Sequence, residues 1–112
     1  MGKKGAKLTE AASEACECLK QDLSSIGDIS SRKMFGGYGL FAGKAMFALV
    51  TSEGKIFFKV AKANQRCYEE AGAEKFGKMP YYALPDAVRK NPTMLDDWAR
   101  ASIKIAYEKR KS

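Results

Sequence analysis

The chain has 112 residues, with 20 lysines and arginines against 13 acidic residues, three cysteines and no histidine. This length is typical of one domain with a hydrophobic core that needs no disulfide or metal. The missing histidine excludes Ser-His-Asp and Cys-His nucleophile arrangements and removes the commonest general base at neutral pH. No apolar run approaches the roughly 18 residues of a membrane span, and no apolar segment follows the first lysines as in a signal peptide. We therefore expect a cytoplasmic protein without membrane contact.

The net charge of +7 is concentrated at the two ends of the chain. Residues 8–103 hold 13 basic and 12 acidic residues, so this body is nearly neutral. We interpret residues 1–7 as a flexible basic N-terminus, 8–106 as a single domain and 107–112 as a basic C-terminal tail. Such ends can hold a polyanion weakly and without sequence preference, although short basic ends more often only solvate a domain.

The cysteines predict free thiols rather than disulfides or a metal site. Cys16 and Cys18 stand two positions apart in a predicted helix and point to different faces, and Cys67 lies in another helix. Without histidine, only thiolates and carboxylates could complete a metal site. We predict no catalytic residue, no metal ligand and no cofactor.

The first predicted element is an amphipathic helix with Thr9 as its N-cap, which ends between Ser24 and Gly27. Its apolar residues recur at helical spacing and would face a sheet. They are Leu8, Ala12, Ala15, Leu19, Leu23 and Ile26.

Residues 29–60 predict a meander of antiparallel strands, because short apolar runs alternate with glycine turns. The first strand should span 29–35, and tight turns are expected at Ala42-Gly43-Lys44 and Ser52-Glu53-Gly54-Lys55. Strict alternation sorts the strand that follows the first of these turns into two faces. It puts Met46, Ala48 and Val50 on one face and Phe47, Leu49 and Thr51 on the other. In the next strand, Ile56, Phe58 and Val60 share a face opposite Phe57 and Lys59.

The segment Gly36-Gly37-Tyr38-Gly39 allows two interpretations. Successive backbone amides without a neighbouring Cβ could approach an anion. No helix start follows the segment, however, and its spacing matches neither a P-loop nor a dinucleotide-binding fingerprint. The context favours a tight turn or bulge with close backbone packing.

The second half of the chain predicts a helix, a strand, one helical turn and a last helix. The helix at 62–71 should end at Gly72, and the strand should begin at Pro80 or lie at a sheet edge. Residues 85–90 fit a single helical turn, and Asn91 followed by Pro92 marks the start of the last helix. In the helix at 62–71, one face would be formed by Ala63, Cys67, Tyr68 and Ala71. In the last helix, the apolar stripe would be formed by Leu95, Trp98, Ser102 and Ile105. Trp98 would anchor the last helix on the sheet, with ligand stacking as the alternative role.

This order of elements predicts an α+β fold in two layers, an antiparallel sheet of about four to six strands with helices packed on it. Four groups of residues then carry a resemblance to a known family. They are Arg32 to Leu40 (RKMFGGYGL), MFALV at 46–50 with FFKV at 57–60, Asn64 and Arg66, and YYALP at 81–85 with Trp98. From about Ser31 to Ala106 the chain resembles the N-terminal domain of TfoX/Sxy proteins.

The resemblance implies a two-layer α+β fold and a non-enzymatic role in natural competence and DNA uptake. Regulators of this family act with a cyclic-AMP receptor type activator at promoters of competence genes. Full-length regulators carry a second, C-terminal domain. The family offers no established catalytic or ligand-binding residues to transfer to this chain.

Three functional hypotheses follow. The first is a regulatory module that acts through a protein partner in transcription regulation or by self-association. The second is weak, salt-sensitive and non-specific DNA binding through the basic ends. The third is a ligand-binding domain or enzyme in which the glycine segment covers a pocket beside Tyr38, Tyr81 and Tyr82.

The residues predicted to contact a protein partner or nucleic acid are Arg32, Lys33, Gly36, Gly37, Tyr38, Lys59 and Arg66. An edge strand such as 81–84 could also pair with a copy of itself, so a homodimer is a further hypothesis.

Overall fold

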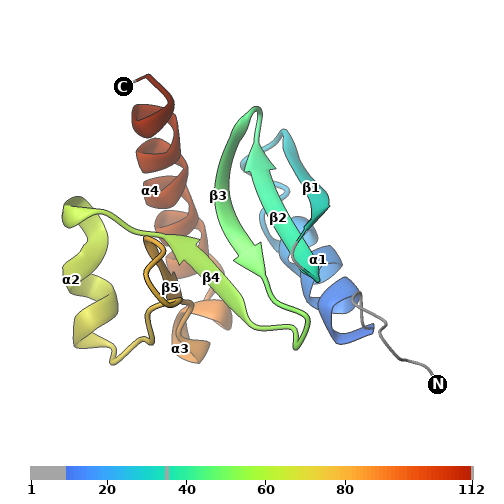
Figure 1. The fold of residues 1–112 in the computed structure, drawn as a ribbon, viewed down its shortest axis with the longest axis horizontal. Coiled ribbons are helices and arrows are strands. Elements are labelled where there is room, and N and C mark those ends of the chain that lie inside the picture. Colours follow the sequence, from blue (N-terminus) through green and yellow to red (C-terminus); the bar gives the residue numbers. More distant parts are fainter. Residues whose placement is uncertain (1–9, 35, 112) are drawn as a thin grey trace.

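The computed structural model of the protein describes residues 10–34 and 36–111. Its five strands form one antiparallel sheet in chain order, β1-β2-β3-β4-β5, with helices against it (Figure 1). The predicted α+β fold is confirmed. The elements are α1 (Glu10–Asp22), β1 (Ile29–Met34), β2 (Gly37–Ala42), β3 (Ala45–Val50), β4 (Ile56–Lys59), α2 (Lys62–Glu70), β5 (Tyr81–Ala83), α3 (Asp86–Arg89) and α4 (Pro92–Lys111).

The main core lies between one face of the sheet and the helices. Helix α1 packs on β1, β2 and β3, and α4 packs on β3 and β4 of the same face. Burial of apolar side chains between these two layers is the main driving force for such a fold. The largest apolar side chains that are fully buried in this core are Leu19, Leu23, Leu40, Phe47, Phe58, Tyr68 and Leu95.

Helix α1 presents its predicted apolar stripe to the sheet, with Ala12 and Leu19 buried. Cys16 is buried on the same stripe, one of the three free thiols among the described residues. The predicted cap Thr9 and the predicted contact Leu8 lie outside the described residues.

Strict alternation fails in β3, because the strand pairing shifts register. Leu40 pairs with Ala48 but Phe41 pairs with Met46, so Phe47 is an extra residue at this step. The bulge reverses the face of every residue before it relative to those after it. The predicted separation of Phe47 from Ala48 is therefore wrong. The helix-covered side chains of β3 are Ala45, Phe47, Ala48 and Val50.

The glycine segment is one turn residue followed by a strand. Gly36 has φ +79° in the turn between β1 and β2. Strand β1 spans Ile29–Met34, and Phe35, the predicted last residue of this strand, lies outside the described residues. Gly37 lies inside β2, where a Cβ would stand 1.9 Å from the carbonyl oxygen of Val50. The predicted tight turn at this segment and its close backbone packing are both present, and Gly37 to Gly39 continue from the turn into β2.

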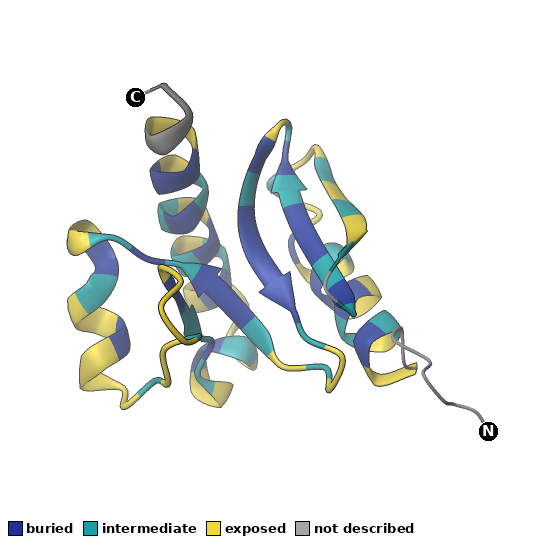
Figure 2. Ribbon diagram, in the orientation of Figure 1, coloured by how far each residue is buried: buried dark blue, intermediate teal, exposed yellow. Residues whose placement is uncertain are grey.

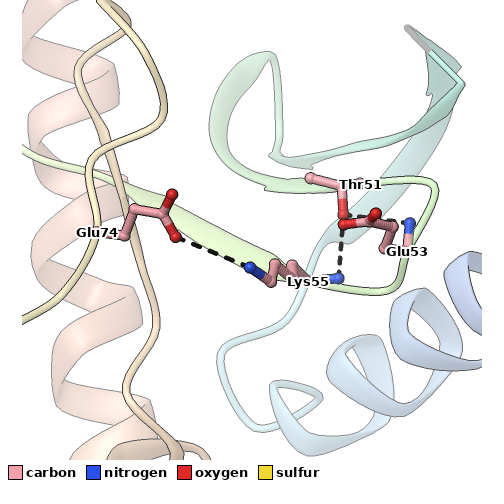
Figure 3. A network of polar contacts seen from close by, with 4 residues as sticks. All are labelled: Thr51, Glu53, Lys55 and Glu74. Atoms are coloured by element: carbon pink, nitrogen blue, oxygen red, sulfur yellow. Dashed lines mark hydrogen bonds and ion pairs between the residues drawn. The ribbon is translucent and has the colours of Figure 1, made fainter.

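The turn between β3 and β4 is organised by Thr51 (Figure 3). Its Oγ1 accepts hydrogen bonds from the backbone amides of Glu53 (3.3 Å) and Lys55 (3.1 Å). Gly54 takes φ +86°, as the hairpin prediction required. The Lys55 ammonium lies 3.8 Å from the Glu74 carboxylate, which links the hairpin to the segment before β5.

Helix α2 buries Tyr68 as predicted, but the other residues predicted on the same face are exposed. Asn64 and Tyr68 are buried, whereas Ala63, Cys67 and Ala71 are exposed. The reason is a polar cap. The Asn64 Oδ1 accepts from the Ala61 amide at 2.8 Å, and its Nδ2 donates to the Lys59 carbonyl at 3.3 Å. A buried amide with both ends satisfied ties the helix to the end of β4.

Helix α4 begins as predicted, because the Asn91 Oδ1 accepts from the amides of Thr93 and Met94, both at 3.1 Å. The helix continues to Lys111, so most of the predicted tail at 107–112 is helical.

Trp98 packs against the main core as predicted, but its aromatic contact is with α2. It is half-buried and packs on Tyr68 of α2, with ring centroids 4.6 Å apart. The helix is held on the sheet by Leu95, Ala99 and Ser102 instead, and the Ser102 hydroxyl donates to the Lys59 carbonyl at 2.8 Å.

Candidate interaction surface

The second face of the sheet carries a smaller apolar cluster to which none of the described helices contributes. We call this side the open face. Leu49, Phe57 and Tyr81 are 6%, 4% and 2% exposed there. The side chains that cover them come from neighbouring strands and from the segment before β5. They are Met34, Met46, Phe76 and Ala83.

The open face has this composition because of the bulge in β3 and the alternation in β4. The bulge turns Met46 and Leu49 to the open side, and alternation puts Phe57 beside them. Gly39 provides the floor, since a Cβ there would lie 2.8 Å from the sulfur atoms of both Met34 and Met46. Flexible methionine side chains therefore occupy the space that a side chain in β2 would have filled.

A groove of about 380 Å³ lies beside this cluster. We call it the methionine groove. Its exposed rim includes Met79, which is 41% exposed, and Phe76 packs on Phe57 with ring centroids 4.9 Å apart. The full lining is Met34, Tyr38, Leu49, Val50, Thr51, Ser52, Phe76 and Met79. The groove is therefore shaped for an apolar group.

The outer edge of β5 is already paired. The Phe76 amide donates to the Tyr81 carbonyl, and the Ala83 amide donates to the Glu74 carbonyl, both at 2.8 Å. Lys75 and Tyr82 form the bridge between these two bonds. The edge strand at 81–84 from which the homodimer hypothesis started is thus covered by the chain's own backbone.

The outer edge of β1 is open. The Gly43 amide donates to the Asp28 carbonyl (3.2 Å), and antiparallel pairs alternate between bonded and non-bonded. Ile29, Ser31 and Lys33 therefore direct their backbone amides and carbonyls outward. Within the described part of the chain, none of these groups has a backbone partner on that side.

A basic depression of about 230 Å³ lies next to this edge, on the open face. We call it the Arg32 pocket. The Arg32 guanidinium lies over the Phe41 ring, 5.7 Å from its centroid, which orients the charge. Neither Arg32 nor Lys44 has an ion-pair partner among the described residues. The lining consists of Ser30, Arg32, Phe41, Gly43 and Lys44.

The structure brings together most of the predicted contact residues but not all. Arg32, Lys33, Gly36, Gly37 and Tyr38 lie along the hairpin of β1 and β2. The Tyr38 hydroxyl lies 3.1 Å from the Ser13 hydroxyl of α1.

The other two predicted contact residues lie elsewhere. Lys59 stands at the end of β4, with its ammonium 5.2 Å from the Tyr81 ring centroid. Arg66 lies on α2, where it pairs with Glu70 at 3.1 Å. The seven residues therefore do not form one continuous basic patch.

The sequence interpretation missed several residues of this surface. Ser30, Phe41 and Lys44 join Arg32 only through the pairing of β1 with β2. The sequence does indicate that Ser30, Arg32 and Met34 lie on one face of the sheet, because alternate residues of a strand share a face. The other residues missed on this surface are Met46, Phe76 and Met79.

The ionisable groups with shifted pKa values are all held in their neutral forms. Burial raises the pKa of the Cys16 thiol, of the Tyr68 hydroxyl and of the Tyr81 hydroxyl, the last to about 12. Such shifts oppose formation of a thiolate or phenolate nucleophile at neutral pH. The methionine groove includes Tyr38 of the pocket hypothesis but neither Tyr81 nor Tyr82.

Within residues 10–34 and 36–111, no group of three or more Cys, Asp or Glu side chains could hold a metal ion. No helix in the same residues is long and apolar enough to cross a bilayer.

These features define an α+β domain in which the described residues form one helix-covered sheet face, one open face and one free basic edge. The chain matches the family model of the TfoX N-terminal domain over residues 21–106, and it belongs to this family. It is similar to the DNA transformation protein TfoX1 of Aliivibrio fischeri (strain ATCC 700601 / ES114), with 31% identity over 81 residues. The alignment covers 65% of this chain and 38% of the relative, so the chain spans well under half of that protein. The family is linked to DNA transformation through this relative.

Proposed function

We propose that this chain is a non-enzymatic interaction module that acts in the cytoplasm, through a protein partner, in the regulation of DNA transformation genes. Membership of the TfoX N-terminal domain family is the observation that carries the proposal. The geometry supports it, because the free β1 edge, the methionine groove and the Arg32 pocket adjoin one another. Unpaired strand edges and exposed apolar grooves are features of protein recognition surfaces.

The charge distribution favours a protein partner over direct DNA binding by the domain body. Residues 10–108 hold 14 basic and 13 acidic residues. Arg66, Arg89 and Arg100 are engaged in ion pairs with carboxylates. Tight binding to a duplex needs several cations placed along the phosphates. The basic residues predicted to contact a partner are instead divided among β1, β4 and α2.

The proposal is tested in the cell that carries the gene. We expect its deletion to lower the transcripts of DNA-uptake genes under conditions that induce transformation, and we expect the full chain to restore them. Crosslinking and capture of the tagged chain should then recover a component of the transcription machinery. Unchanged transcripts, together with no such component, would overturn the proposal.

A titration with duplex DNA separates the alternative. Binding at low salt that weakens steeply as salt rises would favour direct DNA contact. Truncation at residue 104 is unsuitable for locating that contact, because Ile105 and Ala106 are buried and the Tyr107 hydroxyl donates to the Ala42 carbonyl at 2.8 Å. Replacement of the basic residues of 1–7 and 109–111 by glutamine keeps the length and removes the charge.

A further inference from the structure

We propose that β1 binds an extended acidic segment of a partner protein as an additional strand, with a carboxylate in the Arg32 pocket and an apolar side chain in the methionine groove. The inference rests on the proposed function, since it names the surface and the chemistry of the partner. Three features support it: the free backbone edge, the uncompensated cations and the adjoining apolar groove.

The backbone of β1 provides the first contact. Ile29, Ser31 and Lys33 present outward amides and carbonyls at every second residue, which is the pattern that an added strand needs. Ser30, Arg32 and Lys33 are exposed along this strand. Figure 2 shows β1 at the rim of the sheet, with only exposed and half-buried residues along it.

The Arg32 pocket provides the charge preference. An added strand lies about 4.8 Å from β1, so its side chains on the open face stand beside Ser30, Arg32 and Met34. A carboxylate next to Arg32 can accept two parallel hydrogen bonds from the guanidinium and face the ammonium of Lys44. A partner carboxylate would supply the ion pair that neither Arg32 nor Lys44 makes with a described residue, although the Asp28 carboxylate lies near Gly43 at the margin of the pocket.

The methionine groove provides the second side-chain preference. Met34 lies two residues along β1 from Arg32, a distance of roughly 7 Å. The residue two positions from the partner's carboxylate therefore stands beside Met34, at the β1 rim of the groove. Methionine side chains adapt to different apolar shapes. The segment should thus carry an acidic residue and a large apolar residue separated by one position.

A second copy of this chain fits the edge less well. Antiparallel pairing of β1 with itself brings Arg32 and Lys33 of both copies together, and like charges opposite each other are destabilising. A nucleic acid would supply anions but would leave the outward amides and the apolar groove without partners. An acidic polypeptide satisfies all three features at once.

The experiment uses the isotope-labelled full chain and the capped peptide Thr-Leu-Thr-Glu-Thr-Leu-Thr. Its glutamate has leucine two positions away on both sides, so it fits β1 in either direction. We expect NMR shifts at the amides of Ile29, Ser31 and Lys33 at peptide concentrations up to a few millimolar. The same peptide with lysine in place of glutamate should bind about tenfold more weakly or worse, as the loss of a charge-assisted contact predicts.

Two variants sharpen the result. The Arg32→Glu variant should no longer bind the glutamate peptide and should instead bind the lysine peptide, because the substitution reverses the charge of the pocket. Lys33→Pro removes one outward amide without removing a bond to β2, and it should weaken both peptides, whereas Lys33→Ala should not. Circular dichroism and thermal unfolding show whether each variant is folded. Binding of the lysine peptide by Arg32→Glu would itself show a folded site, because a misfolded protein cannot gain this binding.

Three results would overturn the inference. The first is the absence of shifts at β1 with the glutamate peptide. The second is a set of β1 shifts caused by duplex DNA and abolished by Arg32→Glu. The third is a dimer in sedimentation that Lys33→Pro dissociates, since this would assign the edge to self-association. None of them affects the proposed function, which depends on transcripts and captured components in the cell.

Discussion

The two faces of the sheet are both apolar, but they are buried by different means. On one face, Phe47 and Phe58 are fully buried beneath α1 and α4. On the other face, Leu49 and Phe57 are nearly as buried, yet only strand side chains and the segment before β5 cover them. The comparison teaches that low exposure alone does not show whether helices or neighbouring strands bury a sheet face. Helices fix the first face, whereas methionine side chains can move aside on the second.

The largest expected effect separates two neighbours in β4. Phe58→Ala should lower the free energy of unfolding by about 3–5 kcal/mol, because it leaves a cavity beneath the helices. Phe57→Ala should cost about 2 kcal/mol, because Met46 and Phe76 can collapse into the space. Denaturant unfolding of both variants measures the difference. Equal losses would contradict the distinction between the faces.

Alkaline pH tests the burial of the open face. Desolvation raises the pKa of Tyr81 from 10.0 to about 12, so the unfolded chain releases this proton first. The contribution of Tyr81 to the free energy of unfolding is fully present below pH 10 and is lost as the pH rises through about 12. The total loss is about 3 kcal/mol. Tyr81→Phe should remove this part of the alkaline destabilisation. Denaturant unfolding of the wild type and of Tyr81→Phe at several pH values measures this difference. If both proteins lose the same free energy of unfolding between pH 10 and pH 12, Tyr81 is not buried.

The third prediction concerns the close approach of β2 and β3. Gly37→Ala should destabilise the fold by about 1–3 kcal/mol, because its Cβ would meet the Val50 carbonyl. Gly72→Ala is the control, since its Cβ would meet nothing and only the positive φ opposes it. Thermal unfolding should show the larger loss for the Gly37 variant. A larger loss at Gly72 would mean that backbone conformation outweighs the contact.

The smallest expected effect is on the rim of the open face. Met79→Ala and Arg32→Ser should each change stability by less than about 0.5 kcal/mol, because both side chains lie on the surface. Each should nevertheless weaken binding of the glutamate peptide. Calorimetric unfolding and peptide titration of the same samples make the comparison. A large loss of stability without a loss of binding would assign these residues to the core instead.

Features set by local chemistry could be predicted from the sequence. Asn91 followed by Pro92 favours a helix start through its own side chain and ring, and Gly54 marks the hairpin between β3 and β4. The helical stripe of α1 and the α+β order of elements follow from periodicity.

Features set by pairing could not be predicted in the same way. The face of Phe47 depends on a register shift against β2. The burial of Asn64 depends on the Ala61 amide and the Lys59 carbonyl, which meet it only in the folded chain. For the site, Arg32 and Lys33 could be predicted from the sequence. The free edge of β1 could not, because it depends on the strand order, and the methionine groove could not, because it forms only when Phe76 and Met79 lie beside β3.

The most direct test of partner recognition by the β1 edge compares two charge-reversal variants in the cell that carries the gene. Arg32→Glu changes the Arg32 pocket, and Arg66→Glu makes the same change of charge on α2, away from the open face. At equal protein levels, we predict that Arg66→Glu restores the transcripts of DNA-uptake genes in a deletion strain and that Arg32→Glu does not. Full restoration by Arg32→Glu would contradict the claim that the β1 edge recognises the partner.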